Sequence, residues 1–259
     1  MAGLYEKHAE IYALARPKYP REWFSKLASL TAHHKRAWDA GTGSGQAAIN
    51  VAEHYEQVIA TDVSEAQIKH ATPHPKVQYI HTPLSISEQD LVSILGGEGS
   101  VDLVTVATAV HWFDLPSFYS IVNRVLRKPG GVIAVWTYSY DISPLEDVMK
   151  RFYDSSLPYM DDRARYAFEG YRTLPFPFES IGLGTEGNPA SVDMDLEVSF
   201  DRFVELLRTG SAVNTAKERG VDLLSEEVVK ELRTAWGGSD IRKITFKAFM
   251  LAGTPKLEG

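Results

Sequence analysis

Three glycines at alternate positions are the most informative feature of this sequence. They lie in the segment 39–46 (DAGTGSGQ), directly after a short apolar run. Glycine lets a backbone turn sharply and approach a ligand where any Cβ would intrude. Dinucleotide-binding loops have the spacing G-x-G-x-x-G and set a pyrophosphate on a helix N-terminus. The tighter spacing of Gly41, Gly43 and Gly45 suits a cofactor without a pyrophosphate, whose charged amino-acid tail lies against the loop.

An acidic residue closes the next apolar run, about twenty residues after the loop, where dinucleotide sites also carry one. Asp62 ends the segment 57–62, and its carboxylate can accept hydrogen bonds from both hydroxyls of a ribose. The structural alternative is that Asp62 caps the following helix, although Ser64 is the better cap residue. The loop and Asp62 together predict a site for a nucleoside cofactor.

A histidine and a tryptophan follow the predicted strand 101–108. His111 and Trp112 stand at the carboxyl edge, where open α/β sheets bind ligands. A histidine there can serve as a general base, and Trp112 can form a pocket wall. The alternative is that Trp112 packs under the next helix and His111 bonds to backbone. The other histidines lack metal-ligand spacing, so we expect no metal site.

The elements that position these residues alternate regularly in the first half of the chain. Strands are predicted over 36–40, 57–62, 77–82, 101–108 and 131–138, with helices over 45–54, 64–71 and 116–127. Strands that alternate with helices indicate βαβ units, hence a doubly wound, Rossmann-like α/β fold. The segment 139–190 is rich in aromatics and prolines and has no clear strand, so we expect it to be an inserted substrate cap. Beyond it, strands are predicted over 192–198 and 241–252, and helices over 200–209 and 225–236.

Composition limits the class of protein. The chain has 259 residues and a net charge of −7, from 27 Lys and Arg against 34 Asp and Glu. An acidic chain without a dense basic run is a poor candidate for binding nucleic acid. It has no cysteine, no signal-like N-terminus and no apolar run long enough to span a bilayer. We therefore expect one cytoplasmic domain (1–259) with a small-molecule substrate, with no nucleic acid or membrane partner, as a monomer or a homodimer.

The pattern D-x-G-x-G-x-G with Asp62 resembles the class I S-adenosylmethionine-dependent methyltransferases. The run RPKYP at 16–20 and the run AVHWFD at 109–114 are similar to the trans-aconitate methyltransferase-like, methyltransferase-11 branch. The resemblance implies S-adenosyl-L-methionine as methyl donor, S-adenosyl-L-homocysteine as product, and a seven-stranded, mostly parallel sheet whose last strand is antiparallel. It also implies that residues 1–30 form a helical arm over the cofactor, to which Tyr12, Arg16 and Tyr19 belong.

The resemblance also assigns roles by position. The loop would line the methionine end of the cofactor, Asp62 would hold the ribose, and Thr108 would lie beneath the sulfonium. Where relatives carry an acidic residue after the third strand, this chain has Thr82-Pro83-Leu84, so the adenine contact would be a hydroxyl or backbone group. The expected cofactor-binding residues are Tyr12, Arg16, Asp39, Gly41, Thr42, Gly43, Gln46, Asp62, Val63, Thr108 and Ala109.

The acceptor of the methyl group is the open question. A carboxylate is nucleophilic without help and is our first expectation, whereas a phenol or alcohol needs a base, for which His111 is the candidate. In the cap, tyrosines and arginines could line the acceptor site: Tyr138, Tyr140, Tyr153, Tyr159, Tyr171, Arg163, Arg165 and Arg172. A nicotinamide dehydrogenase would need the six-residue glycine spacing, and a nucleic-acid N-methyltransferase an Asn/Asp-Pro-Pro-aromatic motif. A non-catalytic nucleoside-binding protein stays open at this point.

Overall fold

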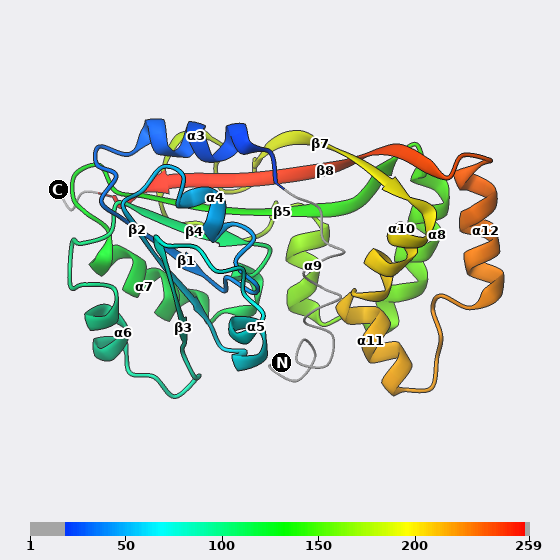
Figure 1. Cartoon of the computed structure of the whole chain (residues 1–259), viewed down its shortest axis with the longest axis horizontal. Coiled ribbons are helices and arrows are strands. Elements are labelled where there is room, and N and C mark those ends of the chain that lie inside the picture. Colours follow the sequence, from blue (N-terminus) through cyan, green and yellow to red (C-terminus); the bar gives the residue numbers. More distant parts are fainter. Residues whose placement is uncertain (1–18, 257–259) are drawn as a thin grey trace.

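A parallel sheet forms the first half of the molecule. The computed structural model describes residues 19–256. Its first five strands are β1 (Arg36–Ala40), β2 (Gln57–Asp62), β3 (Val77–His81), β4 (Leu103–Ala107) and β5 (Val132–Ser143). They pair in parallel in the order β3-β2-β1-β4-β5 (Figure 1). Strands β1 and β2 are buried along nearly their whole length, which requires cover on both faces of the sheet.

Helices supply that cover on each face. Because successive side chains of a strand point to opposite faces, Ala37 and Trp38 belong to different hydrophobic clusters. The Ala37 face packs against α3 (Arg21–Leu30) and α4 (Ala48–Val51), and the Trp38 face against α6 (Glu88–Ile94) and α7 (Leu115–Val125). The short helix α5 (Glu65–Lys69) lies beside β2 and β3. This arrangement confirms the doubly wound α/β fold.

Beyond β5 the sheet becomes antiparallel. The last strand, β8 (Ile241–Thr254), pairs antiparallel with β5, as expected. On its other edge β8 pairs with β6 (Glu179–Leu183) near its end and with β7 (Ala190–Ser199) along its first ten residues. Seven strands follow the path β3-β2-β1-β4-β5-β8-β6, and β7 is an eighth strand beside it. Within the described residues the sheet therefore contains one strand more than the seven expected.

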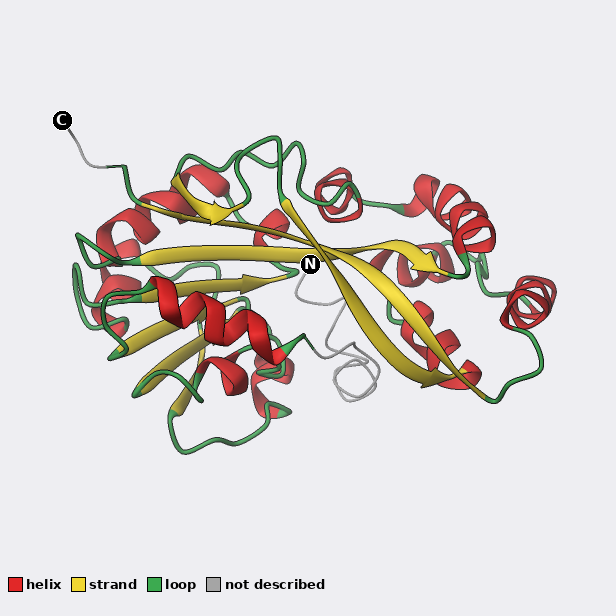
Figure 2. Ribbon diagram, turned by 90° about the horizontal axis from the view of Figure 1, so that it is seen from above, coloured by secondary structure: helices red, strands yellow, loops and turns green. Residues whose placement is uncertain are grey.

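The long strands β5, β7 and β8 carry a second group of helices away from the parallel sheet (Figures 1 and 2). This helical lobe contains α8 (Glu146–Ser156), α10 (Phe200–Arg208), α11 (Ser211–Glu218) and α12 (Glu226–Trp236). Trp236 stacks on Phe203 with ring centroids 5.2 Å apart, and both side chains are buried. Between the lobe and the parallel sheet lies α9 (Asp162–Phe168), which contacts the 3-10 turn η1 (Val110–Trp112) (Figure 1). The 3-10 turn η2 (Leu157–Tyr159) contacts α8 and α11 of the lobe. Within residues 19–256, no helix has the length and apolarity needed to cross a membrane.

Several boundaries differ from the sequence expectation, each for a local reason. The helix expected over 45–54 is reduced to α4, because Gly45 has a positive φ and belongs to the loop. Strand β4 ends at Ala107, since Thr108 has a φ of +54°. Strand β5 continues past Tyr138 through a bulge, and β6 lies within 139–190, where no strand was expected. The lobe also includes helices after residue 199, outside the expected cap. Of the expected arm, the structure describes only the part from Tyr19 onward, which contains α3.

Candidate functional site

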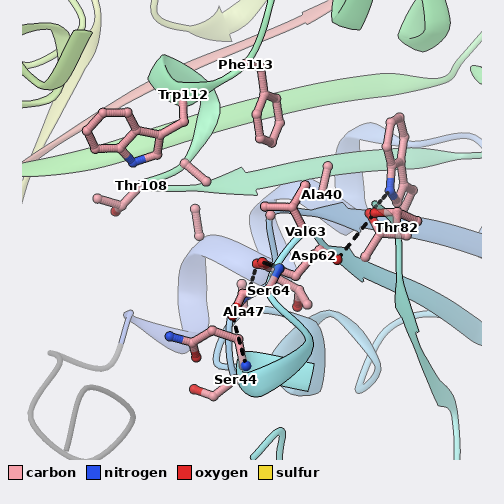
Figure 3. A pocket seen from close by; sticks show the side chains of 18 of the residues that line it. Ala40, Ser44, Ala47, Asp62, Val63, Ser64, Thr82, Thr108, Trp112 and Phe113 are labelled. Atoms are coloured by element: carbon pink, nitrogen blue, oxygen red, sulfur yellow. Dashed lines mark hydrogen bonds between the residues drawn. The ribbon is translucent and has the colours of Figure 1, made fainter. Parts of the chain in front are cut away.

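A cavity of about 320 Å³ lies at the carboxyl ends of the parallel strands. Its walls come from the glycine loop after β1, the ends of β2, β3 and β4, the turn η1, and Tyr138 of β5 (Figure 3). This is the edge where open α/β sheets bind ligands. The structure brings most of the expected site residues to this one cavity: Gly41, Thr42, Gly43, Gln46, Asp62, Val63, Thr108, Ala109 and Trp112.

Two expected residues do not line the cavity, and two others lie outside the described residues. Asp39 and His111 are both buried and do not line the cavity. Tyr12 and Arg16 lie outside the described residues. Tyr19, from the same segment as Tyr12 and Arg16, does line the cavity.

The loop geometry requires glycine. Gly41 has a φ of +65°, and a Cβ on it would lie 2.7 Å from the Ala109 Cβ. Gly45 has a φ of +87°, and a Cβ there would lie 2.1 Å from the Tyr79 hydroxyl. A side chain at either position would combine backbone strain with a clash. At Gly41 the loop therefore presents bare backbone to the cavity.

Asp39, near the end of β1, holds the glycine loop in place. Its carboxylate accepts hydrogen bonds from the Thr42 hydroxyl at 2.5 Å and from the Thr105 hydroxyl at 2.6 Å. These bonds tie the end of β1 to the loop and to β4. Complete burial raises the pKa of Asp39 to about 6, against the effect of the two hydroxyl bonds. Asp39 thus positions the loop without facing the cavity.

Asp62 faces the cavity and also shapes its wall. One carboxylate oxygen accepts the Gly43 N–H and the other accepts the Ser64 N–H, each at 2.8 Å (Figure 3). Burial raises the pKa of Asp62, while the backbone hydrogen bonds lower it. A carboxylate oxygen has two lone pairs, so each oxygen can still accept one bond from a ligand. Ser64 caps α5 by accepting the Gln67 N–H, which confirms its expected role.

The cavity has two sides, one on each side of the glycine loop. Toward β3 its walls are Val63, Thr82 and Leu84, and the Leu84 side chain is 89% exposed at the rim. Thr82 donates its backbone N–H to the Asp62 carbonyl at 2.9 Å. Toward β5 the walls are Thr108, Trp112 and Tyr138, next to the helical lobe. Because β3 and β5 lie on opposite sides of β1, a ligand that fills both ends spans the loop.

Thr108 is held in a strained conformation on the β5 side. Its φ of +54° is uncommon for a β-branched residue. The Thr108 N–H bonds the Trp136 carbonyl at 2.8 Å, and its hydroxyl lies 3.0 Å from the Tyr19 hydroxyl. Strained residues of this kind cluster at functional sites, where surrounding contacts hold them. The pair of hydroxyls therefore has a fixed position at the end of β4.

Trp112 and His111 have different surroundings although they are adjacent. Trp112 lines the cavity, and the Arg163 guanidinium lies 5.5 Å from the centre of its ring. His111 is buried and does not line the cavity, and its Nδ1 lies 3.1 Å from the Tyr171 hydroxyl. Tyr171 is fully buried, which raises the pKa of its hydroxyl. Asp161 holds Arg163 through both carboxylate oxygens.

Some lining residues escaped the sequence analysis. Phe113 and Phe118 form part of the wall near Gly41, but their apolar spacing is that of ordinary core residues. Gln67 also lines the cavity, from α5. Little in the sequence indicated this role, because the burial of Gln67 depends on the loop that it faces.

Comparison with known proteins places this geometry in a family. Residues 38–135 match a family model described as a methyltransferase domain. The chain is 30% identical over 248 residues to a Dictyostelium discoideum protein named as a methyltransferase, covering 93% of this chain and 90% of that protein. A solved structure from Anaeromyxobacter dehalogenans, described as a type II methyltransferase, is 34% identical with a TM-score of 0.76. That match covers 93% of this chain and 99% of the other.

Two further relatives match about half of the chain. A Saccharomyces cerevisiae protein named as an S-adenosylmethionine-dependent methyltransferase is 30% identical over 135 residues, 49% of this chain and 44% of its own length. The tRNA 5-carboxymethoxyuridine methyltransferase of Escherichia coli is 35% identical over 121 residues, 44% of each chain. Both matches are therefore partial.

Proposed function

The chain belongs to the class I S-adenosylmethionine-dependent methyltransferases of the methyltransferase-11 family, and we propose that it methylates a carboxylate oxygen of a small molecule. The family membership makes the chain an enzyme with S-adenosyl-L-methionine as its methyl donor. The proposal concerns the acceptor.

The residues of the cavity fit this donor. The glycine loop offers bare backbone where a Cβ on Gly41 would collide with Ala109. Asp62 has free lone pairs for ribose hydroxyls. An apolar wall for the adenine of the cofactor comes from the rings of Phe113 and Phe118 and the side chain of Val63. When bound, the donor supplies an electrophilic methyl group on a sulfonium.

The protein's part in the transfer is to position the acceptor and to exclude water. An in-line displacement depends on alignment, and a well-oriented pair of reactants gains several orders of magnitude in rate. On the β5 side the cavity is lined by Trp112 and by three residues that carry hydroxyls, Tyr19, Thr108 and Tyr138. Their hydroxyls can hold an oxygen acceptor by hydrogen bonds, leaving one lone pair free to attack.

One observation carries the choice of a carboxylate: the described cavity wall contains no side chain suited to be a general base. Its ionisable residues are Asp62, which holds the loop, and the tyrosines Tyr19 and Tyr138. His111 lies behind the wall, with Nδ1 directed at Tyr171. A carboxylate is ionised at neutral pH and needs no base. A phenol or alcohol would need His111 to leave its buried position.

Charge near the acceptor side supports the same choice. Arg163 lies over Trp112, and Asp161 keeps its guanidinium oriented. A guanidinium can bind an anionic part of the acceptor that is not itself methylated. The relative named for carboxymethoxyuridine also has a carboxyl-bearing acceptor in its name. A free small molecule is favoured over tRNA for this chain because its net charge is −7.

The test is a matched acceptor panel with the purified protein and labelled methyl donor. Carboxylic acids should give base-labile methyl esters, and their methyl-ester and phenol counterparts should give no product. Methylation of phenols, lost on replacing His111, would overturn the carboxylate assignment. Methylation of tRNA alone would overturn the small-molecule assignment.

A further inference from the structure

Gln67 is a buried polar residue whose side-chain oxygen has no hydrogen-bond partner among the described residues. It is the third residue of α5 and is only 3% exposed, yet it lines the cavity. Its Oε1 is enclosed and accepts no hydrogen bond from residues 19–256. Buried side-chain polar atoms are hydrogen-bonded in the large majority of cases, so an exception at a cavity wall points to a ligand.

The position of Gln67 indicates which part of a ligand it meets. Its Oε1 lies 3.8 Å from the position that a Cβ on Gly43 would take, and no other atom of the described residues outside 42–44 lies within 4 Å of that position. The Gly43 N–H donates to Asp62. Gln67 and Asp62 therefore approach the same glycine, and Gln67 lies on the side of the cavity that Asp62 marks for the ribose.

The backbone around Gln67 fixes that position. Its N–H donates to the Ser64 hydroxyl at 3.3 Å, in the first turn of α5. The Ser64 N–H in turn donates to Asp62 at 2.8 Å. One turn of chain therefore sets both side chains relative to the loop.

We propose that Gln67 is a second ribose-binding residue, whose carboxamide pairs with a hydroxyl of the cofactor beside Asp62. A ribose hydroxyl both donates and accepts, so it satisfies the carboxamide whether its oxygen or its nitrogen faces the ligand. The inference depends on cofactor binding and not on the identity of the acceptor.

Because the Gln67 Oε1 has no partner among the described residues, the proposed role predicts that a substitution affects stability and ligand affinity differently. A buried acceptor without a partner destabilises the ligand-free protein, and an apolar side chain of similar shape removes that cost. The variant Gln67→Met should therefore melt at the same temperature as the wild type or higher when ligand-free. Its affinity for S-adenosylhomocysteine should fall about tenfold, the loss expected for one hydrogen bond. If Gln67 were purely structural, its substitution would lower the melting temperature of the ligand-free protein and leave the affinity unchanged.

The experiment is calorimetric titration of wild type and Gln67→Met with four ligands. These are S-adenosylhomocysteine, its 2′-deoxy and 3′-deoxy analogues, and 5′-methylthioadenosine, which keeps the ribose but lacks the amino-acid tail. The loss caused by the substitution should persist with 5′-methylthioadenosine and disappear with one deoxy analogue. Gln78→Met is the matched control, because Gln78 is exposed on β3 outside the cavity wall, and it should bind all four ligands like the wild type.

Each other outcome contradicts the proposal. A loss confined to S-adenosylhomocysteine would assign Gln67 to the amino-acid tail. An equal loss with all four ligands would exclude a ribose hydroxyl as its partner. Unchanged affinity, or a lower melting temperature of ligand-free Gln67→Met and of a second variant, Gln67→Leu, would leave Gln67 with a structural role. Because no acceptor is present, these results are separate from the test of the carboxylate proposal.

Discussion

The two ends of the cavity are built in different ways. The end toward β3 lies beside one short stretch of chain, in which the glycine loop and Asp62 belong to one βαβ unit, and Thr82 and Leu84 complete it. The end toward β5 is assembled from three separate stretches of the chain, which contribute Tyr19, then Thr108 and Trp112, and then Tyr138. A local stretch of sequence thus determines the cofactor end, whereas the acceptor end depends on how distant elements pack.

This difference separates the two tasks of the enzyme physically. The cofactor end is fixed by backbone hydrogen bonds and by glycines that admit no side chain. The acceptor end is bordered by rings and by α9, beside the helical lobe. Substitutions at the acceptor end can therefore change the acceptor without disturbing the donor. The two ends should then respond independently to substitution.

The largest effect is expected for Asp62→Ala. The change removes the acceptor for ribose hydroxyls and releases the N–H groups of Gly43 and Ser64. Hydrogen bonds to a charged group are worth roughly 1.5–3 kcal/mol each, so the affinity for S-adenosylhomocysteine should fall at least about a hundredfold. Calorimetry measures the affinity, and Asp62→Asn, which keeps one oxygen acceptor, should lose less. Unchanged affinity in a folded Asp62→Ala protein would refute the ribose assignment.

Asp39 predicts a pH dependence of stability that belongs to the cofactor end. Its pKa is raised from 3.8 to about 6 in the folded protein, chiefly by burial. The folded state therefore holds a proton that the unfolded chain has released, and stability falls as pH rises through this window. Ionisation of Asp39 should lower the free energy of unfolding by about 3 kcal/mol, and this loss should be complete above about pH 6.

The variant Asp39→Asn should lack this loss, because it has no proton to release. Urea unfolding at several pH values between about 4 and about 7 gives the free energy of unfolding of each protein. The slope of this free energy against pH should differ between the two proteins. Thr105→Val, which removes one hydroxyl bond to Asp39, should move the window to higher pH. Parallel stability curves for wild type and Asp39→Asn would contradict the raised pKa.

Gly41→Ala should separate backbone strain from steric conflict at the loop. Gly99 is a matched control, because its φ of +63° is close to the +65° of Gly41 but a Cβ on it would meet nothing within 4 Å. Both variants should lose about 1 kcal/mol of stability from the left-handed conformation. Only Gly41→Ala should also lose cofactor affinity, by about tenfold or more, as its Cβ pushes against Ala109. Equal behaviour of the two variants in calorimetry would show that the close approach to Ala109 is unimportant.

The same division explains how far the sequence could predict the structure. The bounds of strands β1 and β2 were predicted to the residue, because their signals are local. For the same reason the glycine loop and Asp62 were predicted to form one site, and both line the cavity. The position of His111 was not predictable, since its partner Tyr171 is sixty residues away. Strand β6 was missed because only its pairing with the end of β8 defines it. Gln67 was missed because its burial depends on the loop that it faces.

Arg163→Ala should affect the acceptor end alone. Loss of the guanidinium over Trp112 should raise KM for a carboxylate acceptor about tenfold, the value of one charge-assisted contact at a half-exposed site. The affinity for S-adenosylhomocysteine should not change. Arg165→Ala is the matched control, because Arg165 is on the same helix, is similarly exposed and pairs with Asp162 instead. An equal effect of both substitutions would indicate general electrostatic attraction and not a specific contact.

The smallest catalytic effect is expected for His111, although it adjoins Trp112. A general base would cost 10²–10⁴-fold in rate when removed. Because His111 faces Tyr171 and not the cavity, His111→Ala should change kcat by less than about threefold and leave the pH profile of kcat unaltered. Its effect should appear in stability, since the buried Tyr171 hydroxyl loses a partner at a cost of about 1–3 kcal/mol. Adding Tyr171→Phe should recover part of that loss, because the second change removes the hydroxyl that has lost its bond to His111. If His111→Ala instead abolished turnover while the cofactor still bound, the acceptor end would contain a base after all, and the first acceptors to test would be phenols.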